Sequence, residues 1–267
     1  MSAALPPALP TFWEFHAPAD WRTVDFISDL HLAADTPATF EAWAAHLRGT
    51  EADAVFILGD LFEVWVGDDS RHTGFEARCA EVLADASTRR SIAFMCGNRD
   101  FLVGSALLKE CGVLALPDPT VLVAFGERLL LSHGDALCLS DLDYQRFRAV
   151  VRSPIWQRDF LVRPLEERRA LARGLRDRSE ERKASQPSDA WFDIDTATAA
   201  RWMHESATPT LIHGHTHRPA VEDLAPGYTR HVLSDWDLDH AGAARAEVLR
   251  LRRAGLGVAL TREAPSA

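Results

Sequence analysis

Cysteine is scarce in this 267-residue sequence, and the four present, at positions 79, 96, 111 and 138, form no C-x-x-C pair. That pattern excludes a disulfide framework at this length and indicates a reducing compartment. No apolar run approaches the roughly 20 residues that a membrane span needs. The first 21 residues lack a basic segment followed by a continuous apolar one, so we expect no signal peptide.

Basic residues are in the minority as well. The chain has 29 Lys and Arg against 39 Asp and Glu, which gives a formal charge of −10. This balance argues against a nucleic-acid partner, although a local basic patch is still allowed. Apolar residues make up 47% and charged residues 25%, as in ordinary globular proteins, so disordered, collagen-like and repeat chains are excluded.

Five short apolar runs each end in Asp, His or Asn. They cover residues 23–28, 52–60, 91–100, 128–135 and 208–217. Helical patterns around 40–47 and 75–86 separate the first three, and this alternation predicts α/β layering. Ligands of open α/β sheets bind beyond the carboxyl ends of strands, so the five clusters should converge on one site. Residues 121–131 predict a hairpin turning at 126–127, and 245–263 predict two antiparallel strands. The expected fold is therefore a sandwich of two mixed sheets flanked by helices.

The domain we expect spans residues 23–263, after an irregular, proline-rich N-terminal extension over 1–22. Residues 144–186 differ from the rest because they carry twelve Lys and Arg against six Asp and Glu, a net charge of +6. Apolar residues recur there at roughly helical spacing. We expect a helical cap with an apolar and cationic surface, inserted between the fourth and fifth strands. A solvated helical hairpin with an ordinary core face is the alternative.

The polar clusters at the strand ends have the chemistry of a metal centre. They are Asp29-Leu30-His31, Gly59-Asp60, Gly97-Asn98-Arg99-Asp100, His133-Gly134-Asp135 and the run from His213 to His217. Carboxylate, amide and imidazole ligands suit Mn, Fe, Co or Zn. Seven candidate ligands are too many for one tetrahedral zinc but enough for two ions bridged by a carboxylate, for which Asp60 is the natural choice. Two such ions about 3.5–4 Å apart are suited to phosphoester hydrolysis.

The order of the motifs resembles that of the calcineurin-like metallophosphoesterase superfamily over residues 23–235. The motifs are D-x-H, GD, GN-x-D, H and GHTH. The resemblance implies a four-layer α-β-β-α sandwich with a dinuclear site, where catalysis would involve Asp60, Asn98, Arg99 and His215. The ligands it implies for one ion are Asp29, His31, Asp60 and His217, and those for the other are Asp60, Asn98, His133 and His215. His213 matches no ligand position and is expected to support the ligands.

Arg99 stands where most relatives in that superfamily have a His that helps protonate an alkoxide leaving group. Arginine cannot act as an acid near pH 7, so the leaving group should need little proton help, as a phosphate leaving a phosphoanhydride does. We expect Arg99 to clamp phosphate oxygens. Pairing with a local carboxylate is the alternative.

Longer segments resemble the UDP-2,3-diacylglucosamine diphosphatase family of lipid A biosynthesis. They are GDLFEVWVGDD (59–69), GNRDFL (97–102), SHGDALC (132–138) and HGHTHRPAV (213–221). This resemblance implies attack at the α-phosphorus of a UDP-linked diacyl sugar, with UMP and 2,3-diacylglucosamine 1-phosphate as products. It also implies manganese as the preferred ion and transient contact with the cytoplasmic face of the inner membrane.

The same family pattern implies which residues touch the substrate. They are Asn98, Arg99, Asp141, Ser179 and His215. The family has Asn where Lys183 stands and a Lys near position 186, where this chain has none, so Lys183 is expected to supply that cation from a shifted position.

Two other functions are considered. One is a dinuclear phosphoesterase for dinucleoside polyphosphates, cyclic nucleotides or phosphoproteins, which Arg99 and the basic, apolar insertion disfavour. The other is a binding module that has lost its metals, although none of the seven ligands is missing.

Among the remaining residues, Trp65 is expected to pack its loop, and Asp100 and Asp135 to support the ligands. Asp68 and Asp69 could either accept from ligand histidines or cap helices. Five histidines have no motif context and no expected role: His46, His72, His204, His231 and His240.

Overall fold

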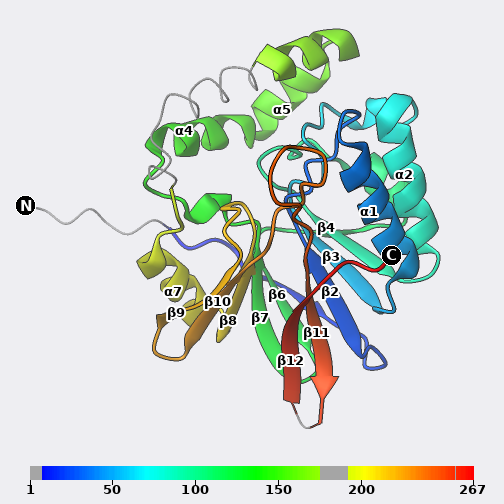
Figure 1. The fold of residues 1–267 in the computed structure, drawn as a ribbon. Helices are drawn as coiled ribbons and strands as arrows, with labels where there is room; N and C mark the ends of the chain where they lie inside the picture. Colours follow the sequence, from blue (N-terminus) through cyan, green and yellow to red (C-terminus); the bar gives the residue numbers. More distant parts are fainter. Residues whose placement is uncertain (1–7, 175–191, 256) are drawn as a thin grey trace, which may run out of the picture.

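Two six-stranded sheets pack face to face and carry helices on their outer faces (Figure 1). The computed structural model describes residues 8–174, 192–255 and 257–267. The strand order is β12-β11-β2-β3-β4-β5 in one sheet and β1-β6-β7-β8-β10-β9 in the other. The predicted four-layer α-β-β-α sandwich of two mixed sheets is therefore confirmed.

The first sheet has a parallel centre that is covered on both faces. Its strands are β2 (Thr23–Ile27), β3 (Ala54–Leu58), β4 (Ser91–Met95), β5 (Leu114–Leu116), β11 (Val248–Ala254) and β12 (Gly257–Glu263). The helices of this half are α1 (Pro37–Gly49), α2 (Gly74–Ser87) and α3 (Ser105–Glu110). Trp43 of α1 and Leu83 of α2 share a core cluster with Ile57 of β3. All five residues of β3 are buried, as continuous apolar strands require.

The second sheet packs against the first and is covered by α7 (Thr196–Glu205). Its strands are β1 (Trp13–His16), β6 (Thr120–Ala124), β7 (Glu127–Ser132), β8 (Thr210–His213), β9 (Ala220–Ala225) and β10 (Tyr228–Val232). Trp202 of α7 packs with Leu130 and Leu211 in an outer core, whereas Phe56 and Leu131 meet between the sheets. β7 and β8 run parallel, so their carboxyl ends emerge together.

The cap follows β7, as predicted, and lies beyond the carboxyl ends of the strands (Figure 1). It contains α4 (Leu142–Val151), α5 (Pro154–Leu161) and a helical stretch over 165–174. The rest of the predicted insertion lies outside the described residues. Arg168 anchors the cap to the sandwich: it is only 2% exposed, donates to the carbonyl of Val66 and pairs with Asp69.

The expectation of an irregular extension over residues 1–22 is wrong for residues 13–16. They form β1, which pairs in parallel with β6, and Phe15 packs 5.6 Å from Phe56 between ring centroids. A four-residue strand that gains its stability from a distant partner leaves little local signal. The hairpin β6–β7 is confirmed, but it turns at Phe125–Gly126, one residue earlier than predicted.

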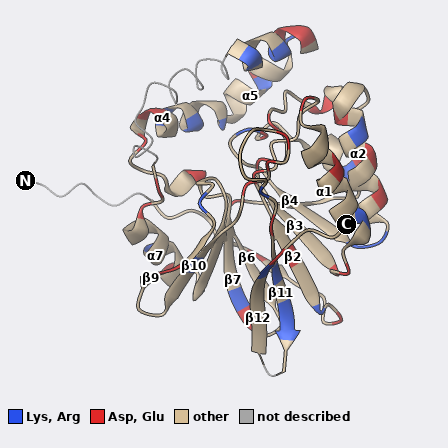
Figure 2. Cartoon of the chain, in the orientation of Figure 1, with Lys and Arg blue, Asp and Glu red and all other residues tan. Residues whose placement is uncertain are grey.

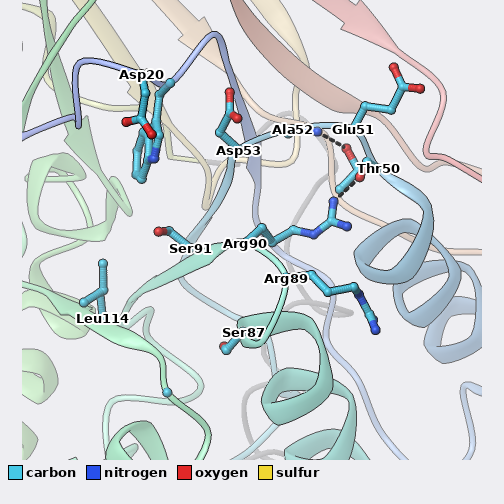
Figure 3. A pocket seen from close by; sticks show the side chains of 12 residues that line it. Asp20, Thr50, Glu51, Ala52, Asp53, Ser87, Arg89, Arg90, Ser91 and Leu114 are labelled. Atoms are coloured by element: carbon cyan, nitrogen blue, oxygen red, sulfur yellow. Dashed lines mark hydrogen bonds between the residues drawn. The ribbon is translucent and has the colours of Figure 1, made fainter.

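A hollow of about 590 Å³ lies at the amino ends of β3 and β4 (Figure 3). Three of the charged side chains that line it interact with other residues of the protein. Asp53 accepts the backbone N–H groups of Arg22 and Thr23, Arg90 donates to the carbonyl of Thr50, and Arg89 pairs with Asp85. None of the residues predicted for the functional site lines this hollow.

His46 on α1 should make stability depend on pH. Burial, aided by Arg250 and opposed by Asp25, lowers the pKa of this fully buried histidine to about 4, from 6.5. The folded protein therefore binds that proton less well than the unfolded chain, and stability is lost as the pH falls from 6.5 towards 4. Between pH 6.5 and pH 4, the free energy of unfolding of the metal-free wild type, measured in urea, should fall by about 3 kcal/mol more than that of His46→Gln.

The exposed histidine His72 provides the matched control. His72→Gln should follow the wild type at both pH values. Parallel pH profiles for the wild type and His46→Gln would contradict a buried neutral imidazole.

Candidate active site

All seven predicted ligands lie at the same end of the two sheets. Asp29 and His31 follow β2, Asp60 follows β3 and Asn98 follows β4. His133 follows β7, and His215 and His217 follow β8. The parallel strands bring their carboxyl ends together, so residues far apart in the sequence, such as His31 and His217, which are separated by 186 positions, come into contact.

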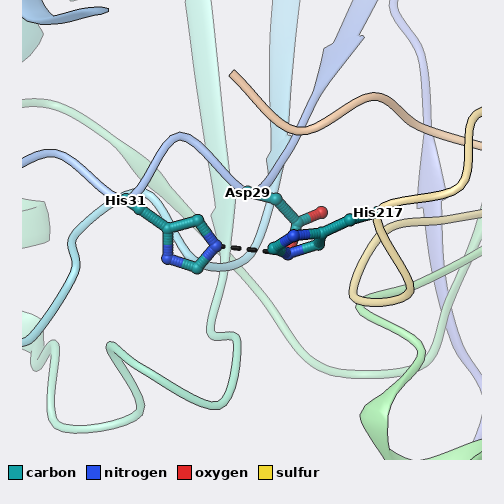
Figure 4. A group of neighbouring side chains, drawn as sticks. All are labelled: Asp29, His31 and His217. Atoms are coloured by element: carbon teal, nitrogen blue, oxygen red, sulfur yellow. Dashed lines mark hydrogen bonds and ion pairs between the residues drawn. The ribbon is translucent and has the colours of Figure 1, made fainter. Parts of the chain in front are cut away.

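The first ligand group comprises Asp29, His31 and His217 (Figure 4). The two imidazole Nε2 atoms lie 3.3 Å apart, and Nε2 of His217 lies 3.3 Å from Oδ1 of Asp29. One ligand atom from each of the three residues falls within 4.8 Å of the others. These residues therefore fit a single divalent cation of the borderline kind that binds nitrogen and oxygen.

The second ligand group forms around the side-chain oxygen of Asn98. This Oδ1 lies 2.9 Å from Nε2 of His133 and 2.8 Å from Nδ1 of His215. Asp60 lies between the groups, with Oδ1 3.7 Å from Nε2 of His133 and Oδ2 4.0 Å from Nε2 of His31. Its two oxygens thus face different clusters, which is the arrangement that a bridging carboxylate needs.

Asp29 also lies near the second group. Its ligand atom falls within 4.8 Å of those of Asp60 and His133. The family resemblance assigns Asp29 to one ion only, whereas in the structure its carboxylate lies near candidate ligand atoms of both groups. Asp29 is completely buried, so its charge needs close compensation.

Two glycines allow the ligand loops to approach this closely. A Cβ atom on Gly97 would overlap the carboxylate of Asp60, and one on Gly214 would overlap the carboxylate of Asp29. The glycines of the GN and GH motifs are thus explained by close packing. They leave room for ligand side chains from neighbouring strands.

Asp100 holds two ligand loops together through their backbones. Its carboxylate accepts the N–H of Leu61 at 2.8 Å and that of Gly97 at 2.7 Å. These loops carry Asp60 and Asn98. Asp100 therefore supports the ligands, as predicted, by fixing peptide groups. Burial, reinforced by the charge of Asp60, raises the pKa of Asp100 to about 7.

Asp135 connects the site to the cap. Its Oδ2 accepts from the hydroxyl of Tyr144 at 2.5 Å and from Nε of Arg148 at 2.8 Å. Arg152 lies 3.6 Å from the same oxygen and donates to the carbonyl of Gly97 at 2.8 Å. Among the described residues, the Asp135 carboxylate thus contacts helix α4 and Arg152, and support of the ligands by Asp135 stays a prediction.

Arg99 pairs with a local carboxylate, which is the alternative to the expected contact with phosphate. Its Nη1 lies 3.2 Å from Oε1 of Glu63, a local carboxylate. Oε2 of Glu63 lies 3.0 Å from Nδ1 of His31. Sequence reasoning did not single out Glu63, and the available signal was its position three residues after Asp60 in a loop that leads out of the site.

Other predicted residues have diverse surroundings. Asp141 caps α4 by accepting the N–H of Tyr144, while Ser179 and Lys183 lie outside the described residues. Trp65 is buried and donates its indole N–H to Asp68.

Asp68 also accepts three backbone N–H groups at the start of α3 and thereby caps this helix. The carboxylate of Asp69 pairs with Arg168 of the cap. Neither residue accepts from a ligand histidine among the described contacts. His213 is buried outside the ligand groups, and burial lowers its pKa to about 4.

Charge in the site is partly self-compensating. Burial raises the pKa of Asp29, but the neighbouring imidazoles, His217 foremost, outweigh it and hold that pKa well below its usual range. Burial lowers the pKa of His133, but the carboxylates of Asp60 and Asp29 prevail and raise it to about 9. A proton on His133 must therefore leave before the ring can bind a cation.

Known proteins resemble this chain over most of its length. The sequence profile of the calcineurin-like phosphoesterases matches residues 22–219. A "UDP-2,3-diacylglucosamine hydrolase" of Aromatoleum aromaticum is 44% identical over 240 residues, covering 88% of this chain and 95% of that protein. A protein of the same name from Chromobacterium violaceum is 45% identical over 220 residues, covering 80% and 90%. A solved archaeal phosphodiesterase aligns with a TM-score of 0.44 at 10% identity, covering 90% of this chain and 99% of its own.

The geometry predicts that Asp60 decides how many cations the protein holds. After dialysis against manganese, the wild type should retain two ions per chain by elemental analysis. Asp60→Ala should retain less than one ion per chain, because the Asp60 carboxylate faces both ligand groups and its loss weakens both. Asp85→Asn, at an exposed ion pair on α2, is the control and should retain two. Two ions in Asp60→Ala would refute the bridging position.

Proposed function

The chain belongs to the calcineurin-like phosphoesterase family, and we propose that it hydrolyses the pyrophosphate bond of UDP-2,3-diacylglucosamine in lipid A biosynthesis. The products are UMP and 2,3-diacylglucosamine 1-phosphate. One observation carries this proposal: seven candidate metal ligands from five strand ends converge beside an arginine, in a chain about 44% identical to hydrolases of that name. The bond attacked is the one at the α-phosphorus.

Two divalent ions, manganese by preference, are the proposed cofactors. Asp29, His31 and His217 would hold one ion, Asn98, His133 and His215 would hold the other, and Asp60 would contribute to both. The donor set of imidazole, amide and carboxylate groups fits this class of metal. Bound there, the ions supply Lewis-acid polarisation of the phosphate and activation of water.

The protein residues position the diphosphate and neutralise its charge. Arg99 adjoins Asn98 in sequence, and its backbone N–H donates to Oδ1 of Asp60 at 2.8 Å. The backbone of Arg99 therefore lies at the centre of the candidate site. A guanidinium can neutralise phosphate oxygens through paired hydrogen bonds but cannot protonate a leaving group. After attack at the α-phosphorus the leaving group is the sugar 1-phosphate, a phosphate that leaves without that proton. This favours a phosphoanhydride over an alkyl phosphoester as substrate.

The cap suits an acylated substrate. Exposed apolar side chains lie on or beside α4 and α5, among them Val150, Ile155 and Val162, which are 54%, 66% and 77% exposed. Basic residues are interspersed on the same helices (Figure 2). Apolar surface next to positive charge suits acyl chains near anionic phosphate groups. The remaining proposed substrate contacts are Asp141 at the start of α4, and Ser179 and Lys183 in the part that the structure does not describe.

We also propose that the protein contacts the cytoplasmic face of the inner membrane transiently through this cap. In the described ranges, no helix combines the length and the apolar character needed to cross a bilayer. Contact would therefore be peripheral. An interfacial apolar surface with basic neighbours gives reversible binding to anionic lipid.

Hydrolysis should depend on manganese and on Arg99. With UDP-2,3-diacylglucosamine, the wild type should release UMP in manganese and none in chelator. Arg99→Ala should keep both ions but lose about 100-fold in kcat, the usual cost of removing a donor that stabilises transition-state charge. UMP release is followed by chromatography.

Substrate comparison separates this proposal from other dinuclear phosphoesterases. Unacylated UDP-sugars, dinucleoside polyphosphates and cyclic AMP should be poor substrates in the same assay. A faster reaction with any of them would keep the phosphoesterase site but refute the lipid substrate.

Membrane contact through the cap predicts a loss of vesicle binding in a double variant. Ile155→Ser with Val162→Ser should weaken sedimentation with vesicles containing anionic phospholipid by about tenfold, because two apolar side chains are removed from the interface. Val221→Ser, at a residue 56% exposed on β9, is the control and should bind as the wild type does. Unchanged binding of the double variant would exclude the cap as the contact.

A further inference from the structure

Glu63 faces two residues that have different proposed tasks. Its carboxylate lies in the loop after β3 and is only 9% exposed. Oε2 lies 3.0 Å from Nδ1 of His31, and Oε1 lies 3.2 Å from Nη1 of Arg99. One buried carboxylate thus contacts a metal ligand through one oxygen and the phosphate-binding arginine through the other.

The contact with His31 determines which ring nitrogen is available to a cation. A carboxylate oxygen 3.0 Å from Nδ1 favours the tautomer, or the ring orientation, in which Nδ1 carries the proton. Nε2, which lies 3.3 Å from Nε2 of His217 and 4.0 Å from Oδ2 of Asp60, then presents its lone pair to the site. A carboxylate behind a ligating histidine also restrains the ring and increases its basicity.

The contact with Arg99 opposes the binding of an anion, whereas the contact with His31 favours the binding of a cation. The Arg99 side chain is 20% exposed and the Glu63 side chain 11%, so their attraction is only partly screened by water. A phosphate that binds Arg99 must compete with this carboxylate or displace it. Glu63 therefore lowers the affinity of Arg99 for free anions.

We infer that Glu63 is a positioning residue that orients His31 for the cation and serves as the exchangeable counter-anion of Arg99. The inference rests on the proposed metal-dependent cleavage of a phosphoanhydride. It adds that the site is protected against retention of small anions, because phosphate must exchange with an internal carboxylate. Substrate overcomes this competition through its additional contacts.

Glutamine cannot replace glutamate in both contacts. Its side chain has one acceptor oxygen and one NH₂ donor, whereas His31 Nδ1–H and Arg99 both need an acceptor. Glu63→Gln should therefore keep at most one of the two contacts. Glu63→Ala removes both. Glu110, whose exposed carboxylate pairs with Arg71, provides the matched control, Glu110→Ala.

Manganese binding to the metal-free protein tests the His31 contact. By equilibrium dialysis, Glu63→Ala should bind the weaker of its manganese ions about tenfold less tightly than Glu110→Ala, the usual effect of losing a carboxylate behind a ligand histidine. The same loss should appear in the Arg99→Ala background, since this contact does not involve the arginine. An unchanged manganese affinity would overturn this half of the inference.

Phosphate binding tests the Arg99 contact. Calorimetric titration with inorganic phosphate, at manganese concentrations that saturate each variant, should show at least about fivefold tighter binding to Glu63→Ala. In the Arg99→Ala background the same substitution should have almost no effect. Equal tightening in both backgrounds would indicate a general loss of negative charge and overturn the exchange, as would weaker or unchanged binding.

Thermal unfolding establishes whether each variant folds. If Glu63→Ala does not fold, Glu63→Gln decides, because at least one of its two affinities must change; wild-type values for both would refute the inference. Neither readout uses the acylated nucleotide sugar. Failure of that substrate would therefore refute the proposed function and leave the role of Glu63 testable on its own.

Discussion

The active site depends on backbone conformations that L-amino acids avoid. Among the described residues other than glycine, seven have positive φ angles, and five of these are candidate metal ligands: Asp29, His31, Asp60, His215 and His217. Each left-handed residue costs on the order of 1–2 kcal/mol, so the sandwich must hold them in place. Buried strands fix the chain on one side, and the carboxylate of Asp100 accepts peptide N–H groups from two ligand loops on the other. The sharp turns let consecutive loop residues point at one centre.

The cap and the ligand loops form one connected structure. Arg152 of the cap donates to the carbonyl of Gly97, directly before Asn98, while Asp135 receives hydrogen bonds from Tyr144 and Arg148. On the other side, buried Arg168 joins the cap to the loop that continues from Asp60 and Glu63. Residues of the cap and the loops that carry the candidate metal ligands are therefore held by shared contacts. A change in the position of the cap therefore changes contacts of the ligand loops, and the reverse also holds.

The sequence was sufficient to predict two mixed sheets and polar clusters that meet at the strand ends, because apolar runs followed by Asp, His or Asn leave a local pattern. The resemblance to the calcineurin-like superfamily then selected the seven ligand positions within these clusters. The sequence was not sufficient for features that arise from tertiary contact. Strand β1 is only four residues long and is stabilised by β6, over 100 positions away. Glu63 is one carboxylate among many until folding places it between His31 and Arg99. Asp68 had two possible roles, and only its contacts with the start of α3 decide for the helix cap.

The spread of the ligands along the chain also governs when the site can exist during folding. His31 and His217 are 186 residues apart, and their strands belong to different sheets. Closing so long a loop, within a parallel topology, is among the slower events of folding. A nascent chain that has not yet released β8 from the ribosome lacks one candidate ligand of each group, His217 of the first and His215 of the second. The complete set of candidate ligands therefore becomes available only when synthesis has passed β8 and the loop that follows it.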